Sequence, residues 1–378
     1  MYRTKIFAAY LPQYHEIPEN NEFWGEGFTD WIATKNAKPQ FDGHIQPKVP
    51  LNDNYYDLSD PKVLQWQAEL ARKYKIAGFN IYHYWFKGGK KVLETPAENL
   101  LKHPEIDIEY FFSWPNDSWV SSTWNNISGN SWAPALNKTD EKPKILLEFD
   151  YEDQEAWKAH FEYLLPFFND ERYLKIDKKP VFVTMKENNV NLLKKMSEYW
   201  NELAINNGFN GVFMITTKRL TKNNINLDGK FIFQPMFSAW GKREAIDQRI
   251  NKYLKFELKG DSGVRYRYDY DEVWKDIIKY SKKDNEKNLF YGGVVGFDDT
   301  PRRGERARML DNNTPEKFEE YLYELYKLSC EREKEILFLT AWNEWGEGSY
   351  LEPDTLNGYA YLEAVKNAVE RVEQQYAK

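Results

Sequence analysis

The sequence predicts a (β/α)8 barrel, in which eight parallel strands, each followed by helix, close into a ring. Short apolar runs rich in β-branched and aromatic residues alternate with longer segments of helical periodicity. Repeated strand–helix units favour a parallel sheet covered by helices. The chain has 378 residues, no internal repeat and no low-complexity linker, so we expect one domain over residues 1–378 with long decorated loops.

Nine apolar runs are candidate strands, one more than such a barrel needs. They cover 5–11, 78–85, 108–114, 144–149, 179–185, 211–217, 231–236, 289–297 and 336–342. The run 144–149 adjoins a polar, Trp-rich insert at 114–143, so we predict a short strand outside the barrel there.

Helix signals lie between the runs. Asp60-Pro61 and Thr314-Pro315 each pair an N-cap residue with a first-turn proline. A last helix carries Leu362, Val365, Val369 and Val372 on one face. Long loops in compact domains are usually functional or disordered, and three stand out here, at 12–60, 114–143 and 237–270.

Charge and composition exclude several classes of partner and cofactor. The net charge of −7 does not favour nucleic acid or an anionic membrane. The single cysteine, Cys330, allows no disulfide within the chain and no cysteine-based metal site. No signal-peptide pattern, membrane-spanning run or Gly-rich phosphate fingerprint is present. We therefore expect a cytoplasmic protein without a cofactor or metal, and the sequence specifies no oligomeric state.

Aromatic and polar residues gather where the predicted strands end. In a β/α barrel the active site lies at the C-terminal ends of the strands. The candidate substrate-binding residues there are Tyr14, His15, Trp24, Trp31, His83, Trp85, Trp114, Asn116, Trp119, Asp298, Asp299, Asn343, Trp345 and Glu352. Rings that stack on sugar faces, with amides and carboxylates for hydroxyls, are typical of a carbohydrate site, so we expect an oligosaccharide or polysaccharide substrate.

The stretch AWNEWGEGSYLEP, at 341–353, holds two candidate catalytic carboxylates, Glu344 and Glu347. Residues three apart point to opposite faces of a strand, but become neighbours in a helical turn. Gly346 and Gly348 permit such a turn. Glycosidases work with a pair of carboxyls about 5–9.5 Å apart, so this turn suits them. A solvated acidic loop is the alternative.

Four segments carry a resemblance to a known family: YLPQYH, WGEGFTDW, IYHYWF and NEWGEGSYLEP. The last is similar to the NEWHEG…IEP signature of family 99 glycoside hydrolases, the endo-α-mannosidase family. As an ordered set the four resemble the WbsX-like branch of that clan, whose members are generally labelled glycosyltransferases or lipopolysaccharide-biosynthesis proteins. The resemblance runs from residue 5 to about residue 370.

The resemblance implies a (β/α)8 barrel that cleaves α-mannosidic bonds with retention, through a 1,2-anhydro sugar. It makes Glu344 the base that deprotonates the sugar 2-hydroxyl, and Glu347 the acid/base. This sequence departs from the motif at Gly346, where the family has histidine. The missing ring could have contacted substrate or tuned the pKa of a neighbouring acid, so sugar specificity and activity are both in question.

Several candidates have a structural alternative. His83 binds a sugar hydroxyl or is a core histidine. Asp298 and Asp299 contact substrate or pair with Arg302 or Arg303. Glu352 orients the acid pair or closes the turn, and each tryptophan is either a sugar platform or ordinary packing. The tripeptide Asp269-Tyr270-Asp271 has the DxD form that holds a metal in nucleotide-sugar transferases, but it lies in a polar loop before a helix.

Three functions are compatible with this reading. The preferred one is a retaining glycoside hydrolase cleaving an α-linked, mannoside-like glycan with Glu344 and Glu347. The second is a WbsX-like glycosyltransferase of lipopolysaccharide, O-antigen or capsule polysaccharide synthesis. The third is a non-catalytic glycan-binding barrel.

Overall fold

Eight parallel strands close into a barrel in the computed structural model, which describes residues 3–120, 144–219, 225–244, 264, 266–304 and 307–376. The strands follow one another in chain order, and the last pairs with the first, as Lys5 faces Ile336. They are β1 (Lys5–Tyr10), β2 (Gly78–Tyr82), β5 (Glu109–Trp114), β9 (Lys179–Thr184), β10 (Phe213–Thr217), β11 (Gly229–Phe231), β13 (Leu289–Val294) and β15 (Ile336–Thr340). The predicted fold class is confirmed.

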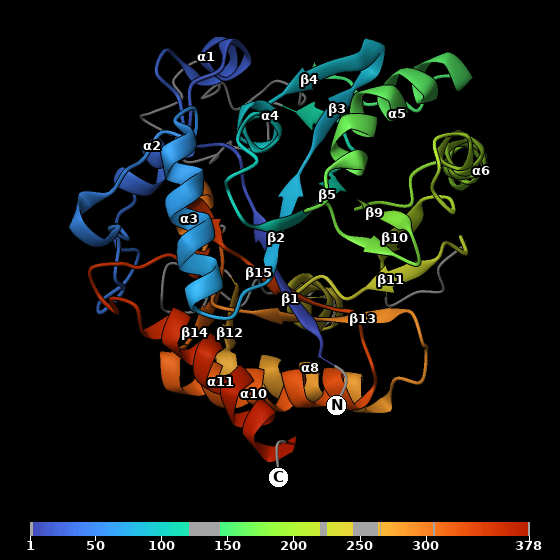
Figure 1. The fold of residues 1–378 in the computed structure, drawn as a ribbon. Coiled ribbons are helices and arrows are strands. Elements are labelled where there is room, and N and C mark those ends of the chain that lie inside the picture. Colours follow the sequence, from blue (N-terminus) through green and yellow to red (C-terminus); the bar gives the residue numbers. More distant parts are fainter. Residues whose placement is uncertain are drawn as a thin grey trace, which may run out of the picture.

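Long helices surround the barrel (Figure 1). They are α3 (Pro61–Lys73), α4 (Thr95–Lys102), α5 (Gln154–Asn169), α6 (Val190–Asn206), α8 (Tyr270–Lys283), α10 (Pro315–Glu331) and α11 (Ala360–Tyr376). The predicted caps are present, because the Asp60 carboxylate accepts from Lys62 N and the Thr314 hydroxyl from Lys317 N. The ends of the described chain meet where Arg3 pairs with Glu373, 3.2 Å apart.

Smaller elements decorate the two ends of the barrel. On the early part of the chain they are α1 (Pro18–Trp24), α2 (Asp30–Lys35), η1 (Leu51–Asp53), β3 (Tyr84–Phe86), η2 (Lys87–Gly89), β4 (Lys90–Val92), β6 (Trp119–Val120), β7 (Ile145–Leu147) and β8 (Lys175–Ile176). Later come η4 (Met236–Glu244), β12 (Tyr266–Asp269), α9 (Thr300–Arg303), β14 (Arg308–Asp311), β16 (Asn343–Glu344), η6 (Trp345–Glu347) and β17 (Ser349–Tyr350).

The surplus ninth run lies outside the barrel. Among the described residues its strand β7 pairs with β6, antiparallel, and with no strand of the barrel, which confirms the prediction for 144–149. Of the three long loops, 12–60 is described throughout and carries α1 and α2. Much of 114–143 and of 237–270 lies outside the described residues.

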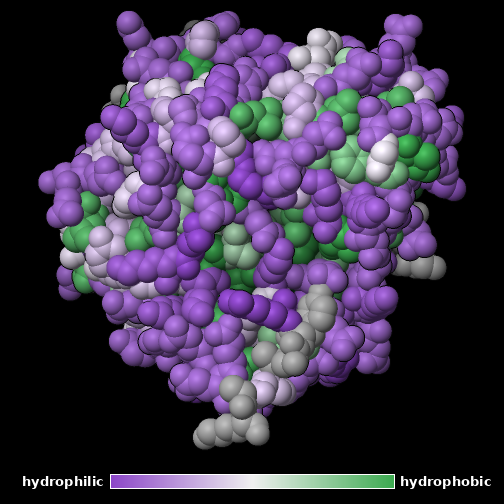
Figure 2. Space-filling view, viewed as in Figure 1, coloured by the Kyte–Doolittle hydropathy of each residue, from purple (hydrophilic) through white to green (hydrophobic). Residues whose placement is uncertain are grey.

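The core fills the barrel and the space between barrel and helices. The strands β13 and β15 are buried along their whole length, which is why they read as continuous apolar runs. The face seen in Figure 2 is mainly hydrophilic, with hydrophobic residues in small separate areas. Within the described residues, no helix combines the length and apolar character needed to cross a membrane.

We expect Gly78→Ala to destabilise the barrel strongly. A Cβ at residue 78 would lie 2.0 Å from the carbonyl oxygen of Glu109 on the adjacent strand β5, and backbone in a closed barrel cannot yield easily. The expected loss in free energy of unfolding is about 3 kcal/mol or more. Gly208→Ala is the control, since its Cβ meets no atom within 4 Å and only its φ of +88° is unfavourable, costing about 1–2 kcal/mol. Equal losses in a denaturant titration would contradict the packing argument.

Candidate active site

The turn after β15 brings the two candidate carboxylates together. The strand β16 ends at Glu344, and the single turn η6 carries the chain helically to Glu347, which is the turn that would make the two residues neighbours. Gly348 follows with φ of +56°, and a Cβ there would lie 2.9 Å from the Cβ of Asp298. Glycine is therefore required at 348 both for its backbone conformation and for space.

One guanidinium contacts both carboxylates. Arg302, on the short helix α9, donates from Nη1 to Glu347 Oε1 at 2.5 Å and from Nη2 to Glu344 Oε2 at 3.2 Å. Its Nη2 also donates to Asp30 Oδ2 at 2.9 Å. Segments far apart in the sequence thus meet in a cluster of three carboxylates and one cation, at the C-terminal ends of the strands.

The two glutamates differ in exposure. The side chain of Glu344 is 7% exposed and that of Glu347 is 30% exposed. Burial and the neighbouring Glu347 charge raise the pKa of Glu344 above its ordinary value, although Arg302 opposes the shift. The pKa of the Tyr82 hydroxyl is also raised, first by burial and then by the charges of Glu344 and Glu347.

Asn343 and Tyr14 hold the turn against the first strand. The Asn343 amide accepts from Leu11 N at 2.7 Å and donates to Leu11 O at 3.0 Å. The Tyr14 hydroxyl donates to Asn343 O at 2.5 Å and accepts from Trp345 N at 3.1 Å. Both predicted residues therefore lie beside the carboxylates, where they fix the backbone that carries them.

Glu352 lies buried on the far side of the turn. Its carboxylate accepts from Tyr56 at 2.8 Å, Gln67 at 2.7 Å and the indole of Trp345 at 2.7 Å. Burial raises its pKa to about 7, although these hydrogen bonds act in the opposite direction. The Trp345 ring stacks on Tyr350 with centroids 3.8 Å apart. The contacts of Glu352 therefore support the base of the turn.

Most of the predicted tryptophans are packed into the protein. Trp31 packs between Tyr14 and Trp345, and its indole donates to Tyr56 O. Trp24 lies in a small cluster with Phe28. Trp114 is buried, and its indole donates to Trp85 O. None of these three rings exposes a free face.

The remaining predicted rings and amide lie around the second and third strands. The two imidazoles of His83 and His160 bond through their Nε2 atoms at 2.8 Å, and burial lowers the pKa of His83 to about 3. Trp85 stacks on His160, and the half-buried Trp119 packs on Tyr84. Asn116 binds the Tyr151 hydroxyl and the backbone of Lys186.

His15 is buried beside the first loop, and burial lowers the pKa of its imidazole. Like His83, His15 is surrounded by other protein side chains. No described contact joins it to Glu344 or Glu347.

Asp298 and Asp299 anchor the loop that carries Arg302. The Asp298 carboxylate accepts from His44 at 2.8 Å, from Gln46 at 2.6 Å and from the Thr300 hydroxyl at 2.6 Å. Asp299 accepts from Arg308 N and pairs with Arg303 at 2.9 Å, and burial raises its pKa to about 7. The ion pair of Asp299 with Arg303, the alternative to substrate contact in the sequence analysis, is present.

The DxD tripeptide has structural contacts. Asp269 caps helix α8 by accepting from Glu272 N, and Asp271 pairs with Lys317 at 2.7 Å.

Neither Asp30 nor the contact of Arg302 with the carboxylates was predicted from the sequence. Asp30 lies inside the quoted segment WGEGFTDW, and Arg302 was considered only as a partner for Asp298 and Asp299. A fully buried Asp30 needs a cation, so an acid inside an apolar segment was the available signal.

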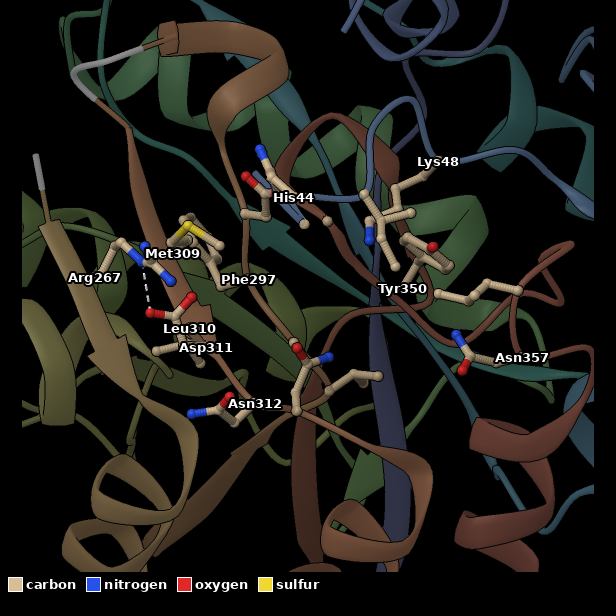
Figure 3. Close-up of a pocket in the computed structure, with 18 of the residues that line it drawn as sticks. His44, Lys48, Arg267, Phe297, Met309, Leu310, Asp311, Asn312, Tyr350 and Asn357 are labelled. Carbon is tan, nitrogen blue, oxygen red and sulfur yellow. Dashed lines mark hydrogen bonds and ion pairs between the residues drawn. The ribbon is translucent and has the colours of Figure 1, made fainter. Parts of the chain in front are cut away.

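A cavity of about 300 Å³ lies behind the turn, beyond Gly348 (Figure 3). His44 and Lys48 line it from the first long loop, Arg267 from β12, Asp298 from the loop after β13, and Asp311 from β14. Arg267 pairs with Asp311, drawn as a dashed line, and His44 with Asp298. The formal charges of the lining therefore balance, with Lys48 and Arg267 against Asp298 and Asp311.

The chain is similar in sequence to a known protein family. Residues 6–365 match the family model described as Glycosyltransferase WbsX. The uncharacterized protein WxcX of Xanthomonas campestris pv. campestris strain B100 is 28% identical over 372 residues, which cover 97% of this chain and 50% of that protein. The chain thus spans about half the length of the curated relatives it matches.

Solved structures share the fold. The GH99 endo-α-mannosidase from Bacteroides thetaiotaomicron matches with a TM-score of 0.57 and 14% identity, over 100% of both chains. A glycoside hydrolase-like protein matches with a TM-score of 0.55 and 12% identity, over 98% of this chain and 94% of that one.

We expect the stability of the protein to fall as pH rises through the pKa of Glu352. The folded state raises this pKa from its ordinary value to about 7. The folded protein therefore binds the proton more tightly than the unfolded chain, and this contribution is complete only below the ordinary pKa of about 4.3.

Glu352→Gln removes this titration. Between about pH 4.5 and 7.5 the wild type should lose up to about 3 kcal/mol relative to the variant. Denaturant titrations across that range measure the difference, with Glu363→Gln, exposed on α11, as the matched control. A difference that does not change with pH would mean that Glu352 is ionised throughout.

Proposed function

We propose, from the premise that this chain belongs to the WbsX glycosyltransferase family, that it is a retaining glycoside hydrolase acting on an α-linked, mannoside-like glycan. The chain is a carbohydrate-active protein of the group that the WbsX family forms with GH99-like barrels. One observation carries the finer proposal: Glu344 and Glu347 lie side by side on one guanidinium, at the strand ends where barrel enzymes have their active sites.

The mechanism uses both acids and needs no protein nucleophile. Glu344 as carboxylate takes the proton of the sugar 2-hydroxyl, and the freed oxygen attacks C1. The bond from C1 to the leaving oxygen breaks, and Glu347 donates its proton to that oxygen. Glu347, now a carboxylate, takes a proton from water, which attacks C1 and opens the three-membered ring. Glu344 returns its proton to the 2-oxygen, so the net reaction is hydrolysis with retention.

The contacts of the pair support this division of roles. Glu344 is the more buried acid, and its raised pKa makes its carboxylate a stronger base once it is ionised. Glu347 is the more exposed of the two and can meet both a leaving group and a water molecule. Tyr82, the last residue of the barrel strand β2, is a candidate donor to sugar hydroxyls at the same end of the barrel.

The family description favours a second candidate, transfer of a sugar from a nucleotide-sugar to a growing polysaccharide. In the part of the chain that the structure describes, the DxD tripeptide serves as a helix cap and an ion-pair partner. We therefore place transfer behind hydrolysis.

Incubation in 18O-labelled water separates the two reactions. Surface oligosaccharides of the source cell are supplied with and without nucleotide-sugars, and the products are weighed by mass spectrometry. We expect one 18O at each new reducing end, lost in Glu344→Gln and in Glu347→Gln but kept in Glu363→Gln. Longer glycans without label, formed only with a nucleotide-sugar, would instead establish a transferase. Bound glycan with neither product would leave a binding protein.

The pH dependence of the rate provides a further prediction. A general base must be ionised, and burial raises the pKa of Glu344. The acid limb of kcat/KM should therefore lie well above the ordinary glutamate pKa of about 4.3, and the rate should rise as pH increases through that limb. A pH–rate profile whose acid limb falls near the ordinary value would exclude Glu344 as the base.

A further inference from the structure

We propose that Arg302 is a positioning residue of the active site. Its guanidinium sets the distance between the carboxylates of Glu344 and Glu347 and the total charge that the two carry. It occupies the space that a side chain at position 346 would otherwise fill. The inference rests on the proposed function for its consequence in catalysis. Its geometry and its main test do not depend on that function.

The first observation is that two different nitrogens of one rigid group bind the two acids. Nη1 contacts Glu347 and Nη2 contacts Glu344. Because a guanidinium is planar, the two carboxylate oxygens are held at a separation that its geometry determines. A lysine ammonium has one charged centre on a flexible stem, and would bind the pair without holding the two acids apart in the same way.

The second observation is the imbalance of charge. Arg302 is 11% exposed and meets three carboxylates, among them Asp30, whose side chain has no exposed surface. If all three were ionised the cluster would carry two excess negative charges, so retaining one proton on the glutamates is favoured. Arg302 opposes the rise in the pKa of Glu344. The cluster therefore favours one protonated and one ionised glutamate. The proposed reaction needs the ionised one to be Glu344.

The third observation concerns Gly346, where the related motif has histidine. A Cβ at this position would lie 2.7 Å from Arg302 Nε and 2.8 Å from Asp30 Oδ2. The ion pair of Arg302 and Asp30 therefore fills the space beside residue 346, and a larger side chain there would displace it. Arg302 can take this position only if residue 346 is glycine. Gly346 therefore makes room beside the acids for the guanidinium of Arg302, where the related motif has the ring of histidine.

The fourth observation is that the position of Arg302 is built into the fold. The preceding Asp298 is held by side chains of the first long loop, His44 and Gln46. Its backbone N–H also donates to Glu347 O at 2.6 Å, which ties the α9 loop directly to the carboxylate turn. A surface arginine that reached the acids by chance would have no such anchoring.

The test measures proton affinity without substrate. The protein is labelled with 13C at glutamate side-chain carboxyls, and Glu344 and Glu347 are assigned from Glu344→Gln and Glu347→Gln. In Arg302→Met the pKa of Glu344 should rise by one unit or more. If the single variant does not fold, the double variant Asp30→Asn/Arg302→Met leaves no unpaired aspartate buried. It is compared with Asp30→Asn, because the Asp30 charge itself raises the pKa of Glu344.

Arg303→Met is the matched control, since Arg303 is the adjacent residue and pairs with Asp299. It should leave the titration of Glu344 unchanged. A wild-type titration curve for Glu344 in a folded variant without Arg302 would overturn the proposal.

Activity adds a second readout. Arg302→Lys keeps the charge and should retain less than a tenth of the wild-type kcat, and guanidinium ion should partly restore the rate of Arg302→Ala where an equal concentration of sodium ion does not. Absence of that rescue, with Glu344 titrating normally, would make Arg302 a structural residue only. If the titration shifts but the wild type hydrolyses no glycan, the proposed function fails and the positioning role stands.

Discussion

The contact of one buried guanidinium with three carboxylates is the interaction on which this site depends. Carboxylates at Asp30, Glu344 and Glu347 repel one another, and Arg302 lets them lie together although Asp30 and Glu344 are buried. The surrounding structure serves that contact: Gly346 leaves room for it, Tyr14 and Asn343 hold the turn, and Asp298 holds the loop. Without the cation, the barrel would place like charges in a low dielectric with nothing to offset them.

The barrel itself could be predicted from the sequence because its strands are buried on both faces. Such strands read as unbroken apolar runs, as β13 and β15 do. The run at 144–149 could be separated from them by its polar neighbourhood, and β7 indeed pairs outside the barrel. The first residues of helices α3 and α10 could also be predicted, because Asp60 and Thr314 cap these helices through hydrogen bonds to nearby backbone N–H groups.

Only part of the candidate active site could be predicted from the sequence, for physical reasons. The spacing of Glu344 and Glu347 is local, and the turn η6 brings them together as expected. Arg302 and Asp30 are 272 positions apart, so no local pattern marks their pairing. A residue's place after a strand also says nothing about where its side chain points, and Trp31 and Trp114 turn into the protein. Burial was the information that the sequence lacked.

The closure of β15 on β1 has a consequence for synthesis of the protein. Both candidate acids belong to the segment that follows the last barrel strand, whereas Asp30 follows the first. During translation Asp30 is synthesised hundreds of residues before Arg302, Glu344 and Glu347. The strand β1 likewise cannot pair with β15 until β15 has been synthesised. In a nascent chain, therefore, the carboxylate cluster assembles only after nearly the whole barrel has left the ribosome.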